Sequence, residues 1–148
     1  MQLYLSLFFE GSPWELANLI ISFFKMQGIK YRDAWLKKTK YTSGEVLETV
    51  NAWSEWFIAW IDVAVDSDEF MEYLREECKL VVNRDIDFQM YPGCDEEMFS
   101  RLIAYLLEKL DGDLYLWSEW DDIILLRKDR QLQIEKESWK EFPALAHG

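Results

Sequence analysis

One segment of the chain combines carboxylates with large aromatic side chains in a way that suits binding. Residues 111–122, DGDLYLWSEWDD, hold five carboxylates, one tyrosine and two tryptophans. Aromatic anchors ringed by acid are suited to docking on a basic protein surface. A second acidic run lies at residues 62–77. We therefore predict a partner-binding surface made of these residues: Asp111, Asp113, Tyr115, Trp117, Glu119, Trp120, Asp121, Asp122, Asp66, Asp68, Glu69 and Glu72.

The residue types that carry most enzymatic chemistry are scarce. The single histidine, His147, lies one residue from the end of the sequence, which argues against histidine-based catalysis and histidine zinc sites. Cys78 and Cys94 are 16 residues apart without other soft ligands, so we expect reduced, structural thiols. The sequence has no glycine-rich phosphate loop. We therefore expect no catalytic residues, no metal site and no cofactor.

Carboxylate chemistry remains open, because the chain has 28 aspartates and glutamates and such chemistry needs only a pair. Asp85 and Asp87 lie in a predicted strand, so both carboxylates should point to one face of a sheet. They could hold a divalent cation, face solvent or meet a basic partner. Residues 66–77 have the spacing of a calcium loop, but Phe70 and Met71 stand where a ligand and a glycine are needed. That stretch is better interpreted as a capped helix.

The string WSEW occurs twice, at residues 53–56 and 117–120. The residues around the two copies share nothing, so the string does not mark an internal repeat. It is similar to the WSxWS box of cytokine-receptor ectodomains, but Phe57 and Asp121 stand where that box has its final serine. We expect Trp53 to lie on the apolar face of a helix, in the core, and Trp120 to be available for binding.

The net charge of −12 is unevenly distributed along the chain. Residues 41–125 carry five lysines and arginines against 21 aspartates and glutamates, whereas the segment before them is basic. This charge favours a basic protein partner and disfavours nucleic acid and membranes. No apolar run reaches the roughly 20 residues of a spanning helix. The N-terminus does not resemble a signal peptide, so we expect a cytoplasmic protein. The basic segment contains Lys25, Lys30, Arg32, Lys37, Lys38 and Lys40.

Hydrophobic periodicity predicts the elements of the first half of the chain. We expect strands at 2–10, 29–36 and 56–64, and helices at 13–27 and 42–53. Ser12 with Glu15 forms a capping box for the first helix, and Gly28 ends it. Thr42 with Glu45 forms a second capping box. A continuous helix over 43–61 is an alternative, because Phe57, Trp60 and Ile61 also continue the helical spacing.

The second half should contain helices at 67–78 and 95–111, strands at 79–91 and 113–117, and a hairpin of strands 122–127 and 131–136. We expect one domain over residues 1–148, with a loose tail at 138–148 in which Trp139 and Phe142 are docked. The predicted fold is α/β (α+β): a single mixed β-sheet with about four helices packed on it and a C-terminal β-hairpin.

In size, acidity, single domain and lack of a catalytic set, the chain resembles the immunity proteins of bacterial polymorphic toxins. The resemblance implies a small cytoplasmic protein that inhibits a cognate toxin by covering a basic surface or active site. It rests on no diagnostic motif, so it assigns no residue a role. Two alternatives stay open: a carboxylate- or metal-dependent enzyme, and a subunit of a larger assembly held by exposed tryptophans.

Overall fold

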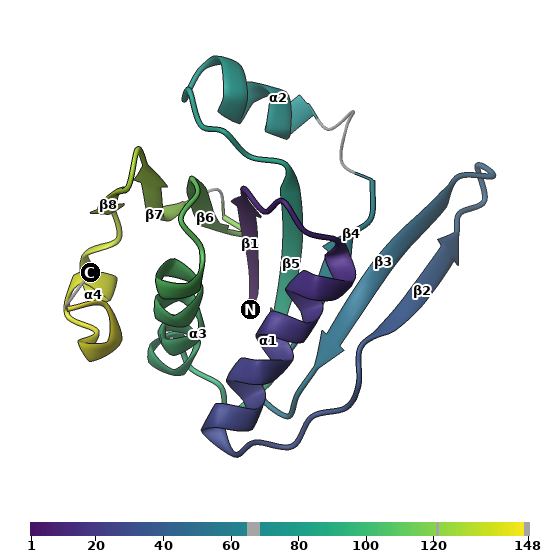
Figure 1. The fold of residues 1–148 in the computed structure, drawn as a ribbon, viewed down its shortest axis with the longest axis horizontal. Helices are drawn as coiled ribbons and strands as arrows, with labels where there is room; N and C mark the ends of the chain where they lie inside the picture. Colours follow the sequence, from purple (N-terminus) through teal and green to yellow (C-terminus); the bar gives the residue numbers. More distant parts are fainter. Residues whose placement is uncertain (65–68, 121, 147–148) are drawn as a thin grey trace.

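The computed structural model describes residues 1–64, 69–120 and 122–146, and its strands form one sheet. The strand order is β2-β3-β4-β5-β1-β6-β7-β8 (Figure 1). The strands are β1 (Gln2–Leu7), β2 (Trp35–Lys40), β3 (Val46–Trp53), β4 (Phe57–Asp62), β5 (Arg84–Met90), β6 (Leu114–Ser118), β7 (Ile123–Lys128) and β8 (Gln131–Ile134). The helices are α1 (Pro13–Gln27), α2 (Glu69–Glu76), α3 (Glu96–Lys109), α4 (Glu137–Lys140) and the 3-10 helix η1 (Pro143–Leu145). Within the described ranges, no helix has the length and apolar character needed to cross a membrane.

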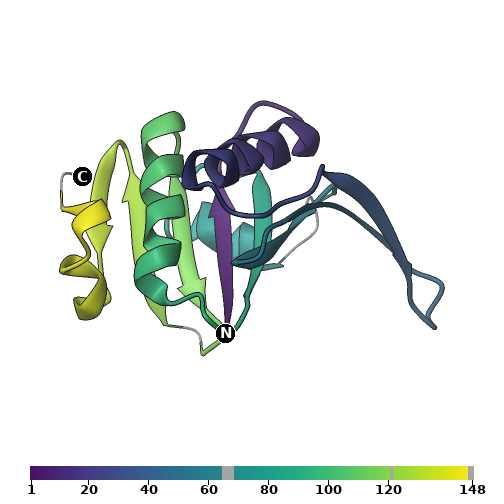
Figure 2. The same ribbon diagram turned by 90° about the horizontal axis from the view of Figure 1, so that it is seen from below.

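The main core lies between the sheet and helices α1 and α3, which cover the same face of the sheet (Figure 2). We call this the helical face. Leu3, Leu5 and Leu7 of β1 all point to it and are buried, because alternate side chains of a strand share a face. Helix α2 packs on the opposite face, the second face, where Met71 and Leu74 cluster with Tyr115.

Phe57 of β4 connects the sheet to both core helices. Its ring centroid lies 5.2 Å from that of Phe24 in α1 and 5.4 Å from that of Phe99 in α3. Both pairs meet edge to face, which is a favourable geometry for aromatic rings. Because Phe57 is fully buried, it fixes how the two helices sit on the sheet.

The elements with strong local signals are confirmed. The Ser12 hydroxyl accepts from the amide of Glu15 at 3.2 Å, and the Glu15 carboxylate accepts from the amide of Ser12 at 3.0 Å. Gly28 ends α1 in the left-handed region, at φ 65°. Helix α3, strand β6 and the hairpin β7–β8 also lie where the pattern predicted them. The hairpin turns at Asp129 and Arg130, whose φ values of 50° and 67° are typical of a two-residue hairpin turn.

The predicted helix over 42–53 is wrong, and so is its longer alternative over 43–61. Strands β2 and β3 form a hairpin instead. In its turn the amide of Tyr41 donates to the carbonyl of Glu45, and the amide of Gly44, at φ 89°, donates to the carbonyl of Tyr41. The hairpin extends beyond the helices that cover the helical face (Figure 2), so Val46 and Leu47 are exposed. Their helical spacing therefore did not indicate the buried face of a helix. The strand predicted at 56–64 is confirmed as β4.

Two strands begin later than predicted. The strand expected at 29–36 is β2, Trp35–Lys40, and Tyr31 makes only an isolated bridge to Ser54. The β2 segment holds three lysines, and such charged side chains suit an edge strand because they discourage pairing with other chains. The strand expected at 79–91 begins at Arg84, after Lys79 adopts a φ of 58°.

The single sheet, its four helices and the terminal hairpin agree with the predicted fold. All seven strand pairings are antiparallel, in place of the expected mixture of directions. The tail is packed through Leu145: Trp139 is fully buried, with its ring centroid 5.3 Å from that of Phe142. The prediction of a loose tail is therefore wrong for residues 138–146, which pack on the rest of the domain. His147 lies outside the described residues.

A buried arginine of β7 caps the end of α3. The Arg127 guanidinium donates to the carbonyl oxygens of Leu107 at 2.7 Å and Leu110 at 2.5 Å. It also donates to the carbonyl of Gly112 through two nitrogens, at 2.9 and 2.7 Å. Burial lowers the pKa of Arg127, and the nearby carboxylates of Asp111 and Asp113 act in the opposite direction. The guanidinium therefore satisfies carbonyls that the end of a helix leaves unpaired.

We predict that Arg127→Met lowers the free energy of unfolding by about 3 kcal/mol, because three carbonyl oxygens lose a charged donor. Urea denaturation followed by circular dichroism measures the change. Lys128 follows Arg127 in β7, so strand alternation directs it to the second face. Lys128→Met is therefore the matched control and should change the stability by less than about 1 kcal/mol. Equal stability of Arg127→Met and the parent protein would show that the cap is dispensable.

Candidate functional site

The predicted binding residues divide between the two ends of strand β6. Because β6 runs antiparallel to β1, Leu114 lies opposite Leu7 and Ser118 lies opposite Leu3. Asp113 and Glu119 flank the strand and are six residues apart, which corresponds to about 20 Å in an extended chain. The acidic–aromatic segment that is continuous in sequence therefore contributes to two separate surfaces. We call them the α2 end and the Trp120 end.

At the α2 end, Asp113 has a structural role. Its carboxylate accepts from the backbone amide of Val81 at 2.7 Å and from that of Asp129 at 3.2 Å. These bonds tie the segment after α2 and the β7–β8 turn to the start of β6. Asp111 is exposed, as are Glu69 and Glu72 in the first turn of α2. Asp66, Asp68 and Asp121 lie outside the described residues.

The aromatic residues of β6 are covered by α2. The Phe70 ring lies 5.9 Å from that of Tyr115 and 4.4 Å from that of Trp117, between centroids. Trp117 also stacks on Tyr4 of β1 at 5.3 Å. Burial, together with the nearby Cys78 and Tyr73, raises the pKa of Tyr115 to about 12. Tyr115 is therefore a neutral phenol in a packed cluster on the second face rather than an exposed anchor.

The Trp120 end presents the remaining predicted residues to solvent. Glu119, Trp120 and Asp122 are all exposed, and Trp120, at 79%, is the most exposed large hydrophobic residue in the described part of the chain. The loop is nevertheless anchored. The amide of Glu119 donates to the carbonyl of Gln2 at 3.2 Å, and the amide of Ser118 donates to the carbonyl of Asp122 at 3.0 Å. The sheet thus anchors the backbone next to an exposed indole.

An acidic cavity of about 740 Å³ lies at the same end of the sheet. Met1 and Gln89 line it, and Gln89 pairs with Gln2, the residue that anchors the Trp120 loop. The first turn of α3 supplies its carboxylates, and aromatic rings supply part of its wall. These lining residues include Tyr91, Asp95, Glu96, Glu97 and Phe142.

Sequence reasoning missed the carboxylates of this cavity. Asp95 accepts from the amide of Met98 at 2.8 Å and is the N-cap of α3, so its helix-starting role accounted for its presence. Acidic residues in a first helical turn are ordinary, because they complement the helix dipole. Strand β5 runs antiparallel to β1, so the start of α3, which follows β5, lies beside Met1. This proximity is visible only in the folded structure.

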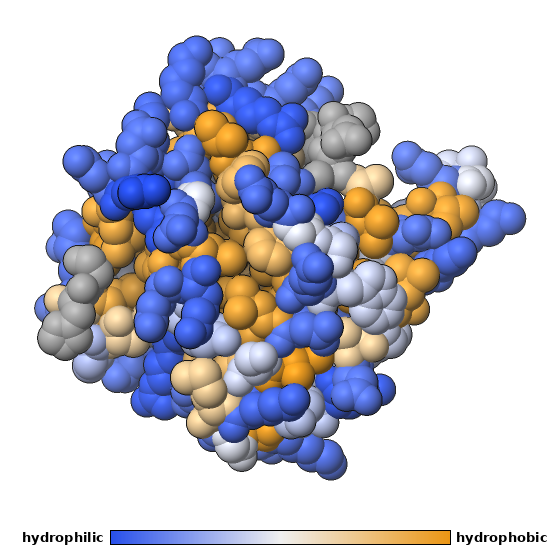
Figure 3. All heavy atoms as spheres, in the orientation of Figure 1, coloured by the Kyte–Doolittle hydropathy of each residue, from blue (hydrophilic) through white to orange (hydrophobic). Residues whose placement is uncertain are grey.

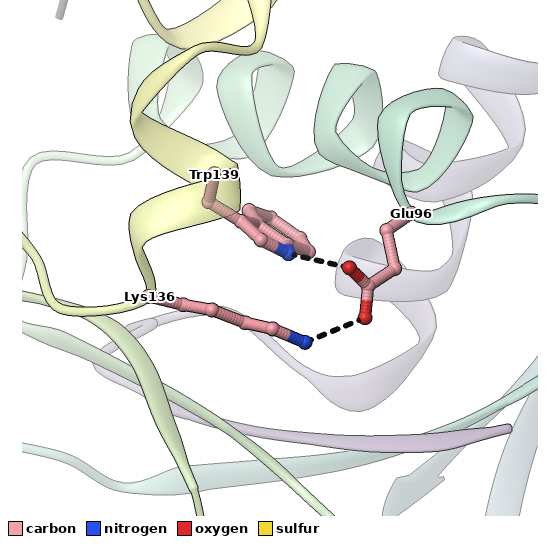
Figure 4. Close-up of polar contacts among 3 residues, drawn as sticks. All are labelled: Glu96, Lys136 and Trp139. Carbon is pink, nitrogen blue, oxygen red and sulfur yellow. Dashed lines mark hydrogen bonds and ion pairs between the residues drawn. The ribbon is translucent and has the colours of Figure 1, made fainter.

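Glu96 joins the cavity wall to the C-terminal segment (Figure 4). Its carboxylate accepts from the Lys136 ammonium at 2.8 Å and from the Trp139 indole nitrogen at 3.2 Å. The second bond satisfies the polar atom of a fully buried ring, which Trp requires when it is enclosed. The pair of bonds fixes α4 against the start of α3.

The charges at the Trp120 end are mostly of one sign. Among the described residues, five carboxylates lie here in addition to Glu55 of the first WSEW copy, and Lys136 forms a salt bridge with Glu96. The end therefore offers negative charge next to exposed apolar side chains, which suits binding of cationic groups. The five are Asp95, Glu96, Glu97, Glu119 and Asp122.

Both WSEW copies lie at this end, in different roles. In the first, the Ser54 hydroxyl accepts from the amides of Trp56 and Phe57 at 3.1 and 3.3 Å and forms the β3–β4 turn. The amide of Tyr91, from the cavity wall, donates to the carbonyl of Trp56. Trp53 ends β3 with Arg32 stacked at 5.1 Å, so its predicted place on a helix is wrong. In the second copy, Trp120 is exposed.

Asp85 and Asp87 share the second face, as predicted. They lie opposite Ser6 and Tyr4 of β1, and the Ser6 hydroxyl donates to the buried Asp85 carboxylate at 3.3 Å. Within residues 1–64, 69–120 and 122–146, no group of three or more His, Cys, Asp or Glu side chains is arranged to hold a metal ion.

We predict that Cys94, in the cavity wall, reacts slowly with iodoacetamide. Burial, together with the Asp95 carboxylate, raises its pKa to about 11. At pH 8 only about one thiol in a thousand is then the reactive thiolate. In a Cys78→Ser protein, mass spectrometry should show alkylation more than about tenfold slower than in urea, and faster as the pH rises toward 10. Equal folded and unfolded rates would contradict the burial.

The described residues of the Trp120 end thus offer carboxylate acceptors and exposed apolar side chains on a fixed backbone. Comparison of the chain with protein-family models, with curated proteins and with solved structures finds no match. The role of the Trp120 end is therefore inferred from its own residues and geometry.

Proposed function

We propose that this chain is a small acidic binding protein that docks its Trp120 end on a basic surface of another protein. The observation that carries the proposal is the Trp120 side chain, 79% exposed between Glu119 and the loop residue Asp122. An exposed indole gains the free energy of apolar burial only when a partner covers it. Carboxylates around such an anchor attract a cationic partner and align it.

In its finer form, the proposal is that the chain is a bacterial immunity protein. It would inhibit a cognate toxin by covering the toxin's basic surface or active site. The net charge of −12 supports this role, because an acidic inhibitor is steered toward a cationic cleft at long range. The exposed acids at the Trp120 end would make that association fast and sensitive to salt.

The first test is co-expression with the product of the gene adjacent to the one that encodes this chain. A stable complex after purification, and rescue of growth when that product is toxic, are the expected results. Sizing by light scattering distinguishes this complex from self-association of the chain. Absence of both complex and rescue would sink the immunity role.

The second test asks which end binds. We predict that Trp120→Ala weakens the complex by about 2 kcal/mol, or about 30-fold in Kd, without lowering the melting temperature, because the ring is an exposed anchor. Trp14 of α1 is 43% exposed and far from this loop in sequence, so Trp14→Ala is the matched control. Surface plasmon resonance measures both affinities. Equal weakening by the two variants would contradict the assignment.

A charge swap separates the two acidic ends. The double variant Glu119→Lys, Asp122→Lys should slow association about tenfold at low salt, because like charges then face the partner. The double variant Glu69→Lys, Glu72→Lys changes the same net charge at the α2 end and should have a smaller effect. The reverse order would move the site to α2.

A carboxylate- or metal-dependent enzyme is the alternative, and the shared face of Asp85 and Asp87 is the observation that favours it. Ions that bind the native state raise the melting temperature. We predict that Mg²⁺, Mn²⁺ and Ca²⁺ at millimolar concentration leave it unchanged. A rise that grows with ion concentration and disappears in Asp85→Asn would support the enzyme instead.

A further inference from the structure

A second cavity, lined mainly by apolar residues and arginines, lies along α3. It has a volume of about 590 Å³, and none of its lining residues belongs to the Trp120 end. Phe23 and Met26 of α1, Leu132 of β8 and Ala144 of η1 form part of its apolar wall. The volume falls in the range of about 300–1,000 Å³ that small-molecule sites occupy. We call this cavity the arginine groove.

The charge of the groove is opposite to that of the whole chain. Three arginines line it, Arg101 of α3, Arg127 of β7 and Arg130 of the β7–β8 turn, and Glu108 is the carboxylate among the described lining residues. Asp111 and Asp113 lie near Arg127, so the positive charge that would attract an anion comes mainly from Arg101 and Arg130, which exceed the charge of Glu108.

The three arginines differ in how many of their guanidinium N–H groups are unpaired. Arg127 uses its guanidinium on the carbonyls at the end of α3, so it supplies charge and a rigid floor. Arg101 and Arg130 are exposed, and no salt bridge between described residues includes either. A planar guanidinium with free donors is well matched to a carboxylate, sulfonate or phosphate group.

The groove also places apolar surface beside these donors. Figure 3 views the molecule from the side of α1 and α3 and shows apolar residues at the surface among hydrophilic ones around these helices. Met26 is 66% exposed, so part of the wall is open to solvent. A ligand that covered it would gain apolar burial as well as the charged contact.

We propose that the arginine groove binds an amphipathic organic anion. The acidic head of the ligand meets Arg101 and Arg130, and its apolar body lies against Met26 and Leu132. This site is independent of the partner-binding role of the Trp120 end, since the two surfaces share no residue.

The experiment uses 8-anilinonaphthalene-1-sulfonate as the probe, because it joins an aromatic body to one sulfonate and fluoresces on apolar surfaces. Titration of the full chain should give saturable binding to a single site, and decanoate should displace the probe while decylamine should not. Arg101→Gln and Arg130→Gln should each weaken binding about threefold, and together about tenfold, as expected for partly exposed charges.

Two controls make the result decisive. The double variant Lys37→Gln, Lys40→Gln removes the same charge from the exposed edge strand β2 and should leave the affinity within twofold. N-phenyl-1-naphthylamine has the same rings without the sulfonate, and its binding should not change in the arginine variants. An unchanged sulfonate affinity in Arg101→Gln, Arg130→Gln would overturn the proposal, as would equal loss of the neutral probe. Near-ultraviolet circular dichroism confirms that each variant is folded.

Discussion

The arrangement of the molecule depends on the pairing of β1 on both sides. The strand lies between β5 and β6, and all its core-facing leucines are buried under α1 and α3. Because both neighbours run antiparallel to it, the residues that follow β5 and those that follow β6 reach the same end of the sheet, beside Met1. The start of α3 and the Trp120 loop therefore converge there although more than 20 residues separate them. The acidic cavity and the exposed indole are consequences of this register.

The parts of the fold that the sequence predicted correctly have local causes. Helix α1 carries its own start at Ser12 and its own stop at Gly28, so no knowledge of the rest of the sheet is needed. The hairpin β2–β3 has no such independence. Its apolar residues Val46 and Leu47 are exposed, so their spacing reflects neither a helix nor a buried strand face. Where tertiary cover is missing, hydrophobic periodicity loses its physical basis.

The sequence predicted the residue types of the candidate site but not which residues the fold brings together there. The acidic–aromatic segment did contain Trp120, yet a strand carries its two halves to opposite ends of the sheet, and Asp113 and Tyr115 serve the structure instead. The carboxylates at the start of α3 were not predicted as part of the site, because the capping of the helix by Asp95 already explained why acidic residues stand there. Residues with a local role can acquire a second one through a long-range neighbour, and a single sequence carries no signal for that neighbour.

The burial of Trp139 has a consequence for how the protein is made. Helix α4 and η1 follow every strand of the sheet in the chain, yet they cover α3 and are fixed to its first turn through Glu96. During synthesis the N-terminus emerges first, so the sheet can be complete while this flank of α3 is still exposed to solvent. Ribosomes that stall just before residue 139 would release a nearly finished domain with an uncovered apolar flank, a form that chaperones and proteases recognise.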